Sequence, residues 1–397
     1  MSERVRLRVA MLHPQMGIGG AERLTLNAAL GLASRGHQPV LFTRELPEER
    51  SFDEARSGVV SVRVEPTRIP LAIGGHLKAP LSIARMVTLA RGLRSQRRSF
   101  DVAYLDLVPH AAPALRSSLA RPILFYCHYP DLLLTPERRG LYQLYRRPLD
   151  LLESRGMAAA NAVAVNSEFT RQVFEKTFPA LPSPTVLYPG VDLTPPPAPP
   201  AASGEILLLS INRFVHAKKL PLAVHALARL KALLPEETFA KVRLTLAGGF
   251  EGSEEEQAVV RAIQDAAREQ SVANTVSIVR NPSDGERARL LASCRCLIYT
   301  PENEHFGLAP IEAMAACKPV VAANSGGPSE TILDEQTGRL RPAEPDAFAQ
   351  AIAPWALDAQ QAESMGRAGR ARVESRFSMD RFSKDLEAIL LRLTGRS

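Results

Sequence analysis

Two glutamates eight positions apart, Glu304 and Glu312, carry the first chemical signal in this sequence. The apolar run Cys296–Tyr299 predicts a strand and residues 307–316 predict a helix, so Glu304 falls in a loop and Glu312 about one and a half turns into the helix. Open α/β sheets bind ligands at the carboxyl ends of strands, and helix N-termini bind phosphate. We therefore expect Glu304 to contact the reacting end of one ligand and Glu312 a more distant hydroxyl pair. The alternative is two acids that contact only solvent.

A basic pair follows another predicted strand of the same half. The strand Ile206–Ile211 runs into Arg213 and Lys218. A guanidinium and an ammonium with this spacing can bind the two phosphates of a diphosphate, and fixed cations there lower the barrier to its departure as a leaving group. The alternative is a solvated basic loop, which the nearby glutamates and helix amides disfavour.

Three further segments also follow predicted strands. His128 ends an apolar run, where a cleft between two domains would lie, although a lone histidine can also be a bystander. The loop with Gly19 and Gly20 has Glu22 where the dinucleotide fingerprint requires a glycine, so we expect it to bind an anion or a sugar hydroxyl, or to be a structural turn. Residues 324–330 offer amides at a helix start, or form a plain turn with a cap.

The pattern of strand, loop and helix repeats along both halves of the chain. It predicts an α/β protein with two doubly wound, Rossmann-like domains that face a cleft. The proline-rich run that begins at Thr194 predicts a stiff linker. We expect an N-terminal domain over residues 1–193, a linker over 194–203, a C-terminal domain over 204–375, and a helix over 376–397 that crosses back to the N-terminal domain.

Length and composition are typical of a globular protein. The 397 residues favour two domains, and 45% of them are hydrophobic. No run is long enough to cross a bilayer and the N-terminus lacks a secretory signal, so we expect a cytosolic protein. The four cysteines are too few for a disulfide framework and are expected to be buried free thiols.

The net charge of +7 is unevenly distributed, because residues 1–190 carry +9 and the remainder carries −2. Residues 85–98 and 138–155 mix arginines with apolar residues at helical spacing, as a helix on an anionic membrane surface does. The alternative is a solvated helix whose apolar side packs on the core. The sequence shows no nucleic-acid recognition motif, so we expect no nucleic-acid partner.

Together these motifs resemble the retaining nucleotide-sugar glycosyltransferases of the GT-B fold, with their Glu-x7-Glu motif and Arg-x4-Lys pair. The resemblance spans nearly the whole chain. It looks strongest to the α-1,3/1,6-mannosyltransferases that extend dolichol-linked oligosaccharide, and the segments that carry it are 13–14 with 19–24, 124–135, 299–301 with 304–307, and 324–328. One departure is that no hydrophobic membrane segment follows the catalytic part, so we expect membrane attachment to be peripheral or supplied by a partner.

The resemblance implies GDP-mannose as donor and a dolichyl-diphosphate-linked mannosyl-chitobiose as acceptor, mannosylated twice at an anionic membrane, on the cytosolic face of the endoplasmic reticulum in a eukaryote. It implies that Glu312 holds the ribose, that Glu304 and His305 hold the mannose, and that His128 lies under the reacting face of the sugar. The diphosphate would be held by Arg213, Lys218 and the amides of Phe306, Gly307 and Leu308.

Retention without an obvious enzyme nucleophile suggests front-face attack, with no metal and no other cofactor. Two other functions stay open. One is a GT-B transferase that moves another sugar nucleotide's sugar to a bacterial-type lipid or glycan, and the other is a sugar-nucleotide-binding regulator without turnover.

Overall fold

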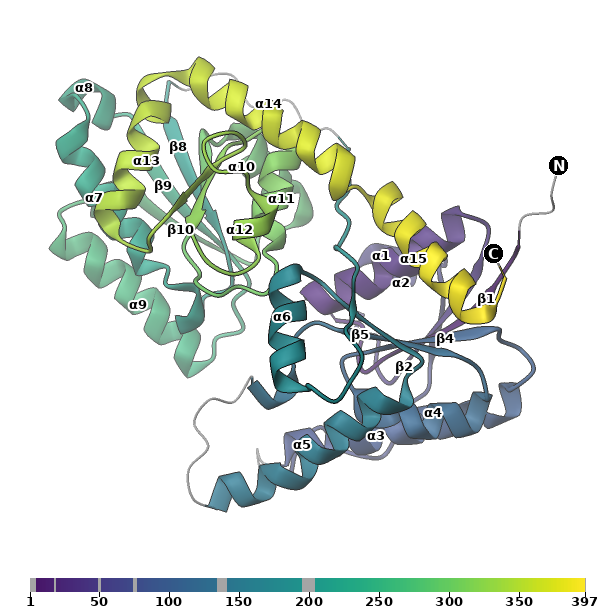
Figure 1. The fold of residues 1–397 in the computed structure, drawn as a ribbon. Coiled ribbons are helices and arrows are strands. Elements are labelled where there is room, and N and C mark those ends of the chain that lie inside the picture. Colours follow the sequence, from purple (N-terminus) through teal and green to yellow (C-terminus); the bar gives the residue numbers. More distant parts are fainter. Residues whose placement is uncertain are drawn as a thin grey trace. The chain divides into compact units, whose positions relative to one another are not determined.

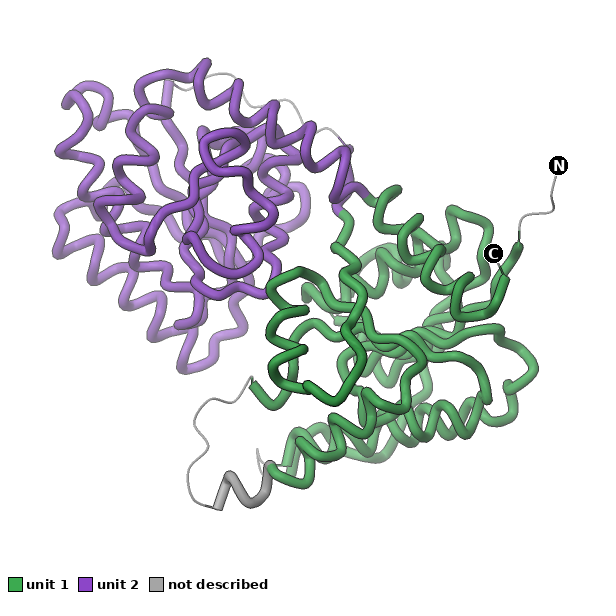
Figure 2. Tube along the Cα trace, viewed as in Figure 1, with its two compact units in different colours: residues 1–190, 379–397 green, residues 191–378 purple. Residues whose placement is uncertain are grey.

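The computed structural model describes residues 5–17, 19–48, 51–73, 77–133, 141–194 and 204–396. The chain forms two compact units (Figure 2): unit 1 comprises residues 1–190 and 379–397, and unit 2 comprises residues 191–378. Val191 and Ser378, the first and last residues of unit 2, form a parallel β-bridge. Residues 195–203 of the predicted linker lie outside the described residues.

Unit 1 is built around a parallel sheet in the order β3-β2-β1-β4-β5-β6-β7 (Figure 1). The strand order reverses between β1 and β4, and ligands bind at the carboxyl edge of such a reversal in open α/β sheets. The strands are β1 Arg8–His13, β2 Gln38–Thr43, β3 Ser61–Val64, β4 Val102–Asp106, β5 Ile123–Cys127, β6 Ala162–Val165 and β7 Thr185–Val186.

Helices cover both faces of this sheet, because successive residues of a strand point to opposite faces. From β1, Val9 and Met11 pack with α1 and α15, whereas Ala10 and Leu12 pack with α3 and α4. The helices of unit 1 are α1 Gly20–Ser34, α2 Asp53–Arg56, α3 Lys78–Gly92, α4 Ala112–Leu119, α5 Leu141–Ala159, α6 Glu168–Thr177 and α15 Met379–Thr394, with 3₁₀ turns η1 Leu93–Gln96, η2 Pro109–Ala111 and η3 Asp131–Leu133.

Unit 2 repeats the architecture with the parallel order β10-β9-β8-β11-β12-β13, which reverses between β8 and β11. Leu208 and Leu244 of its central strands pack in one core with α7, α9 and α13. Its strands are β8 Ile206–Ile211, β9 Val242–Gly248, β10 Val276–Arg280, β11 Cys296–Tyr299, β12 Val320–Ala323 and β13 Arg339–Arg341. Its helices are α7 Pro221–Leu233, α8 Glu236–Phe239, α9 Glu254–Glu269, α10 Asp284–Ser293, α11 Leu308–Ala315, α12 Pro328–Thr331, α13 Pro345–Leu357 and α14 Ala359–Arg376, with η4 His216–Lys218 and η5 Ala273–Thr275.

The predicted pair of Rossmann-like α/β domains is confirmed. The sequence pattern did not show β7 and β13, because strands of two and three residues at a sheet edge are too short to produce a periodic signal. The predicted C-terminal helix is observed as α15, which belongs to unit 1, where Ser383 approaches Gly31 of α1.

The expectation that the apolar residues of segment 85–98 face a membrane is wrong. Met86, Leu89 and Leu93 are buried in the core of unit 1, and Arg85 is also buried, where it pairs with Glu45. Four arginines of the segment remain exposed: Arg91, Arg94, Arg97 and Arg98. The segment therefore packs its apolar side on the core and presents only charge.

The expectation for the second basic segment, 138–155, falls partly on residues 134–140, which lie outside the described residues. In α5, Leu151 and Leu152 are exposed beside Arg155. The expectation of four buried thiols is wrong at one position, because Cys317 is exposed while Cys127, Cys294 and Cys296 are buried.

Candidate functional site

Unit 2 brings the two charged loops to the same edge of its sheet. Lys218 lies in η4 after β8, and Glu304 lies in the loop after β11. Because β8 and β11 are neighbours at the reversal of strand order, their carboxyl ends and these two loops meet. The Lys218 ammonium forms an ion pair with the Glu304 carboxylate, and each side chain is 17% exposed. Thr300 supports the pair by donating a hydrogen bond to the Lys218 carbonyl at 2.6 Å.

This pairing sets the protonation of Glu304. Burial alone would raise the pKa of the carboxyl, but the charge and hydrogen bond of Lys218 outweigh burial, with further help from His305 and Tyr299, so the pKa lies below its ordinary value. Burial and the Glu304 charge raise the pKa of Tyr299 well above its usual range, so its phenol stays protonated and can donate to Glu304. Glu304 is therefore an ionised acceptor at neutral pH.

The glycine loop after β12 packs against the backbone of the Glu304 loop. Gly327 N–H donates to the Glu304 carbonyl at 2.7 Å, and a Cβ at Gly327 would lie 2.4 Å from the Phe306 Cα. A Cβ at Gly326 would lie 2.4 Å from the Glu304 carbonyl oxygen, and Gly326 has φ +65. Only glycines permit this close approach. The predicted turn at residues 324–330 therefore also holds the loop before α11 in place.

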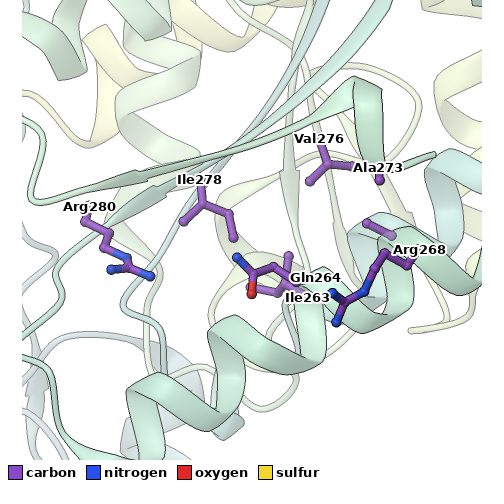
Figure 3. A pocket seen from close by; sticks show the side chains of 8 residues that line it. Ile263, Gln264, Arg268, Ala273, Val276, Ile278 and Arg280 are labelled. Atoms are coloured by element: carbon purple, nitrogen blue, oxygen red, sulfur yellow. The ribbon is translucent and has the colours of Figure 1, made fainter.

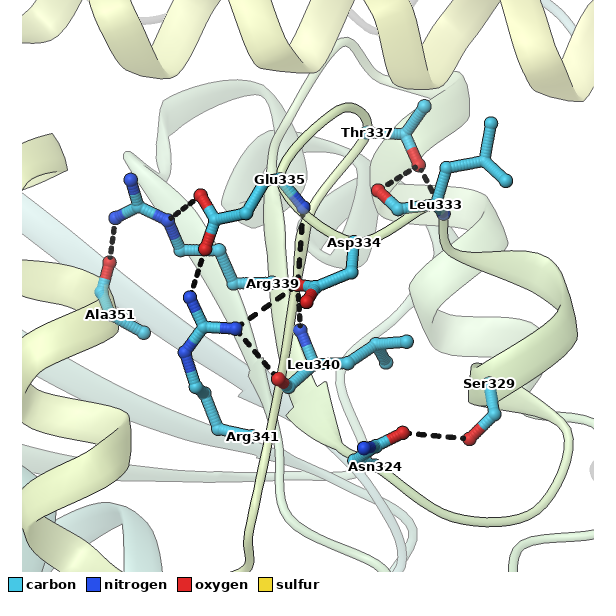
Figure 4. A network of polar contacts seen from close by, with 10 residues as sticks. All are labelled: Asn324, Ser329, Leu333, Asp334, Glu335, Thr337, Arg339, Leu340, Arg341 and Ala351. Atoms are coloured by element: carbon cyan, nitrogen blue, oxygen red, sulfur yellow. Dashed lines mark hydrogen bonds and ion pairs between the residues drawn. The ribbon is translucent and has the colours of Figure 1, made fainter.

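A polar network fixes the far side of that glycine loop (Figure 4). Asn324 accepts a hydrogen bond from Ser329 at 3.4 Å, and Asp334 accepts from the Leu340 amide at 2.9 Å. Arg339 and Arg341 pair with Glu335, and Arg339 also donates to the Ala351 carbonyl at 2.6 Å. These contacts tie the segment after β12 to β13 and α13.

The start of α11 offers backbone amides rather than side chains. Gly307 has φ +87 and precedes the first helical residue, Leu308. The first amides of a helix lack partners within the helix, and they attract anions. The Phe306 ring is buried and packs against Phe377 with ring centroids 6.1 Å apart, so only the backbone of Phe306 is available to a ligand.

Glu312 lies in α11, as predicted, and forms an ion pair with Arg287 of α10. Arg287 was not found from the sequence, because an arginine in an amphipathic helix looks like an ordinary surface residue. Arg213, by contrast, follows β8 and is exposed; its carbonyl accepts from the Val215 amide at 2.9 Å, but its guanidinium makes no hydrogen bond or ion pair in the described part of unit 2. His305 is half-buried beside Glu304, whose pKa it helps to lower.

Unit 1 places His128 directly after β5, where its Nε2 lies 2.9 Å from Oδ1 of Asp106 at the end of β4. The Asp106 carboxylate is fully buried and also accepts from the Thr25 hydroxyl at 2.6 Å and from the Leu107 amide at 2.9 Å. His13, the last residue of β1, points Nε2 at the same carboxylate from 3.4 Å. The cluster therefore sits at the reversal of strand order in unit 1.

The sequence contains a signal for this cluster in two residues that end apolar strands. Asp106 is an acid at the end of an otherwise apolar strand, and His13 ends the first strand in the same way. Burial would raise the pKa of Asp106, but His128, His13 and Thr25 together bring it below its ordinary value. Burial lowers the pKa of His13 despite the neighbouring carboxylate, so that histidine is neutral at pH 7.

The predicted glycine loop of unit 1 begins α1. Gly19 is the residue before the helix and Gly20 is its first residue. A Cβ at Gly19 would lie 2.2 Å from the Glu22 carboxylate, whereas Gly20 has open space around it. The loop is thus partly occupied by the chain's own acid.

A cavity of roughly 530 Å³ lies elsewhere, between α9 and the edge strand β10 (Figure 3). Ile263 and Ile278 line it, with Arg268 and Arg280 among its polar residues, and none of the predicted site residues takes part. Within the described ranges, His, Cys, Asp and Glu side chains form no group of three that could hold a metal ion. Of the helices described, none combines the length and the apolar composition needed to cross a membrane.

Comparisons with known proteins agree with this architecture. A family model described as Glycosyltransferase Family 4 matches residues 18–195, and one described as Glycosyl transferases group 1 matches residues 196–372. The chain is similar to sucrose-phosphate synthase from Thermosynechococcus elongatus, with a TM-score of 0.79 at 20% identity over 98% of this chain and 100% of that one. It is also similar to Anabaena HepE in complex with UDP and glucose, with a TM-score of 0.74 at 21% identity over 97% of this chain and 99% of that one. These likenesses show the fold.

Sequence relatives match over almost the full chain. The α-1,3/1,6-mannosyltransferase ALG2 of Homo sapiens is 38% identical, covering 97% of this chain and 96% of the relative. The protein of the same name from Rhizomucor pusillus is 36% identical over 98% of this chain and 92% of the relative. That of Saccharomyces cerevisiae is 32% identical over 98% of this chain and 85% of the relative.

Proposed function

The chain belongs to the α-1,3/1,6-mannosyltransferase family, and we propose that it transfers mannose from GDP-mannose to a dolichyl-diphosphate-linked mannosyl-chitobiose, forming one α-1,3 and one α-1,6 linkage with retention. The observation that carries the proposal is the half-buried Lys218–Glu304 pair at the strand reversal of unit 2, beside the N-terminal amides of α11. In a sugar-nucleotide donor the diphosphate is bonded directly to the sugar. A cation can bind the diphosphate, and a neighbouring ionised carboxylate can accept hydrogen bonds from the sugar hydroxyls.

The donor fits unit 2 from its nucleotide end to its sugar end. Glu312 accepts hydrogen bonds from the ribose hydroxyls. Lys218, Arg213 and the first amides of α11 bind the diphosphate, and Arg213 is exposed and unpaired among the described residues, so it can reorient onto a phosphate. Glu304 and His305 bind mannose hydroxyls, since an ionised carboxylate is a strong acceptor.

The transfer proceeds on the face of the sugar from which the diphosphate departs. The bond between mannose C1 and the phosphate oxygen breaks, the bond from C1 to the acceptor hydroxyl oxygen forms, and the hydroxyl proton passes to the departing phosphate, which leaves as GDP. Negative charge grows on the diphosphate during this step, so Lys218 and the helix amides stabilise the transition state more than the bound donor.

We further propose that this chemistry needs no metal, because Lys218, Arg213 and the α11 amides supply the positive charge that a divalent ion supplies elsewhere. Activity is expected to survive an excess of chelator. Abolition by chelator, with recovery on adding magnesium or manganese, would contradict this proposal and leave the transferase activity itself standing.

Because its acceptor is lipid-linked, we also propose that the protein works at an anionic membrane surface, on the cytosolic face of the endoplasmic reticulum if its source is a eukaryote. The exposed arginines of the segment 85–98 support this, since basic residues near such a surface attract the protein electrostatically.

The decisive experiment incubates the purified protein with GDP-mannose, with other nucleotide sugars and with a synthetic lipid-linked mannosyl-chitobiose, and reads product masses. The proposal expects two added hexoses from GDP-mannose alone, with α-linkages shown by specific mannosidases. Transfer only from another nucleotide sugar would identify a different transferase, and donor binding without any turnover would identify a regulator.

A further inference from the structure

The contacts of Asp106 determine which ring nitrogen carries the proton in each histidine of the His13–Asp106–His128 cluster. An ionised carboxylate accepts hydrogen bonds and donates none, so the 2.9 Å contact to Oδ1 requires a proton on His128 Nε2. An imidazole whose single proton is on Nε2 has an unprotonated Nδ1, which can accept a hydrogen bond. The same reasoning applies to His13, because the Gln15 amide donates to its Nδ1 at 3.4 Å and leaves Nε2–H directed at Asp106.

The remaining contacts hold the carboxylate and the ring in place. Asp106 is fixed by the Thr25 hydroxyl and the Leu107 amide, one on each oxygen. The His128 ring packs edge-on against Tyr126 with centroids 5.0 Å apart. The backbone carbonyl of His128 accepts a hydrogen bond from the Asn166 side chain at 3.1 Å. His128 is nevertheless 20% exposed, whereas His13 and Asp106 are at most 1% exposed. Only His128 can therefore contact a substrate.

We propose that Asp106 is a positioning residue for mannosyl transfer, which acts through His128 by locking its ring in the tautomer with Nε2–H and an acceptor at Nδ1. The inference rests on the proposed function, and it takes His128 as the member of this cluster that contacts substrate. His128 Nδ1 accepts a hydrogen bond from a substrate hydroxyl. A ring released from Asp106 adopts the other tautomer part of the time and presents a donor where an acceptor is needed.

The first test reads the tautomer directly in wild-type protein. ¹⁵N spectra of histidine-labelled protein distinguish the two neutral tautomers, and the His128 signals are assigned by their loss in His128→Gln. The proposal expects the Nε2–H tautomer in wild-type protein at neutral pH. A His128 that carries its proton on Nδ1 would overturn the inference whatever the kinetics show.

The second test compares two substitutions at one position. Asp106→Ala removes the acceptor, and we expect kcat to fall on the order of 100-fold with donor KM nearly unchanged, because the donor is held by unit 2. Asp106→Asn keeps an oxygen that the Leu107 amide holds toward His128, so it should retain the Nε2–H tautomer and lose roughly 10-fold or less. An Asp106→Ala enzyme with wild-type kcat would overturn the inference.

Two controls separate positioning from folding. Asp101 directly precedes β4, at the end of the strand away from Asp106, and accepts from the Arg8 amide at 2.8 Å, so Asp101→Ala removes a neighbouring acid and should leave kcat unchanged. If Asp106→Ala does not fold, Thr25→Val removes one of the bonds that fix Asp106 while Thr25→Ser keeps it. The proposal expects a kcat loss in the valine variant only, and equal losses in both would overturn it.

The double variant decides whether Asp106 acts through His128. His128→Ala and the combination with Asp106→Ala should lose the same activity, because the carboxylate has nothing to position once the ring is gone. A further loss in the double variant would overturn the inference and leave the proposed function intact. A His128→Ala enzyme with wild-type kcat would instead overturn the contact of His128 with substrate, and the inference with it.

Discussion

Two neighbouring lysines provide a matched test of the leaving-group site. Lys218 pairs with Glu304 and is 17% exposed, whereas Lys219 pairs with Glu302 and is 50% exposed. We predict that Lys218→Ala lowers kcat on the order of 100-fold with little change in donor KM, because the charge it meets grows toward the transition state. Lys219→Ala should stay near wild type. Steady-state kinetics with GDP-mannose measure both, and equal behaviour of the two variants would remove Lys218 from the site.

Substitutions of Glu304 and Glu312 should change different kinetic constants. Glu312→Ala should raise the donor KM, since it removes ribose contacts that are equally strong in ground and transition states, and Glu304→Ala should lower kcat. Glutamine at each position is the conservative control. The pairing of Glu312 with Arg287 adds a check, because Arg287→Ala frees the carboxylate and should alter donor KM without altering kcat. The same kinetic signature for both glutamates would contradict this division of roles.

The sequence was most informative about residues whose charge stands alone at a strand end. Glu304 and Lys218 were predictable as members of one site because both follow apolar strands in an alternating pattern, but their ion pair was not predicted. Arg287 was not, since its contact with Glu312 depends on how α10 and α11 pack, and no periodicity encodes that. The grouping of Asp106 with His13 and Thr25 likewise needs the strand order, which places β1 beside β4.

The close approach of the glycine loop to the start of α11 can be tested by substituting two glycines. A Cβ at Gly327 would lie 2.4 Å from Phe306 backbone, whereas Gly285 in α10 has open space. We predict that Gly327→Ala destabilises unit 2 by about 1–3 kcal/mol and weakens donor binding, because the backbone cannot yield as a side chain does. Gly285→Ala should stabilise by about 0.5–1 kcal/mol.

Denaturant unfolding and calorimetric titration with GDP measure the two effects. Gly327 has φ −56, so its backbone conformation suits alanine and any loss comes from the contact alone. Wild-type donor binding in Gly327→Ala would mean that the α11 amides tolerate displacement and do not hold the diphosphate.

The turn after His128 depends on a buried acid of α5. Glu153 accepts from the Asp131 and Leu132 amides at 2.8 and 3.1 Å, and burial raises its pKa to about 7 despite these bonds. Between its ordinary pKa and 7, the native state therefore keeps a proton that the unfolded chain releases, so the free energy of unfolding falls as pH rises through this window. The contribution is at most about 3 kcal/mol.

We predict that Glu153→Gln removes this pH dependence. From pH 5 to pH 8 the free energy of unfolding of wild-type protein should fall relative to that of the variant, in denaturant titrations at fixed salt. Glu168→Gln, at an exposed position of α6, is the matched control and should follow wild type. Parallel curves for wild type and Glu153→Gln would contradict the raised pKa.

The long strands and helices were predictable because burial on both faces produces continuous apolar runs in β1, β4 and β5. The surroundings of the apolar residues in segment 85–98 could not be predicted from the sequence. Arginine and leucine at helical spacing predict an amphipathic helix equally well whether its apolar side meets lipid or core. The structure resolves this in favour of the core, since Met86, Leu89 and Leu93 are buried.

Burial of the apolar residues of segment 85–98 changes how the protein is expected to bind a membrane. A helix that inserts leucines stays bound in salt, whereas a helix that presents only arginines is held by electrostatic attraction, which salt screens over about 10 Å at 0.1 M. Each basic residue near an anionic surface contributes about 1 kcal/mol. The exposed arginines of segment 85–98 can therefore contribute binding that is lost as salt is raised.

We predict that changing Arg91, Arg94, Arg97 and Arg98 to Glu abolishes pelleting with anionic vesicles at low salt, while transfer to a short-chain soluble acceptor is retained. The matched control changes Arg229, Arg261, Arg268 and Arg367 of unit 2, which are also exposed, so both variants reach the same net charge. If the attraction is local to the segment 85–98, only the first variant loses binding. If both lose it equally, net charge governs binding, and if neither does, the exposed leucines of α5 become the surface to test, because apolar contacts survive a reversal of charge.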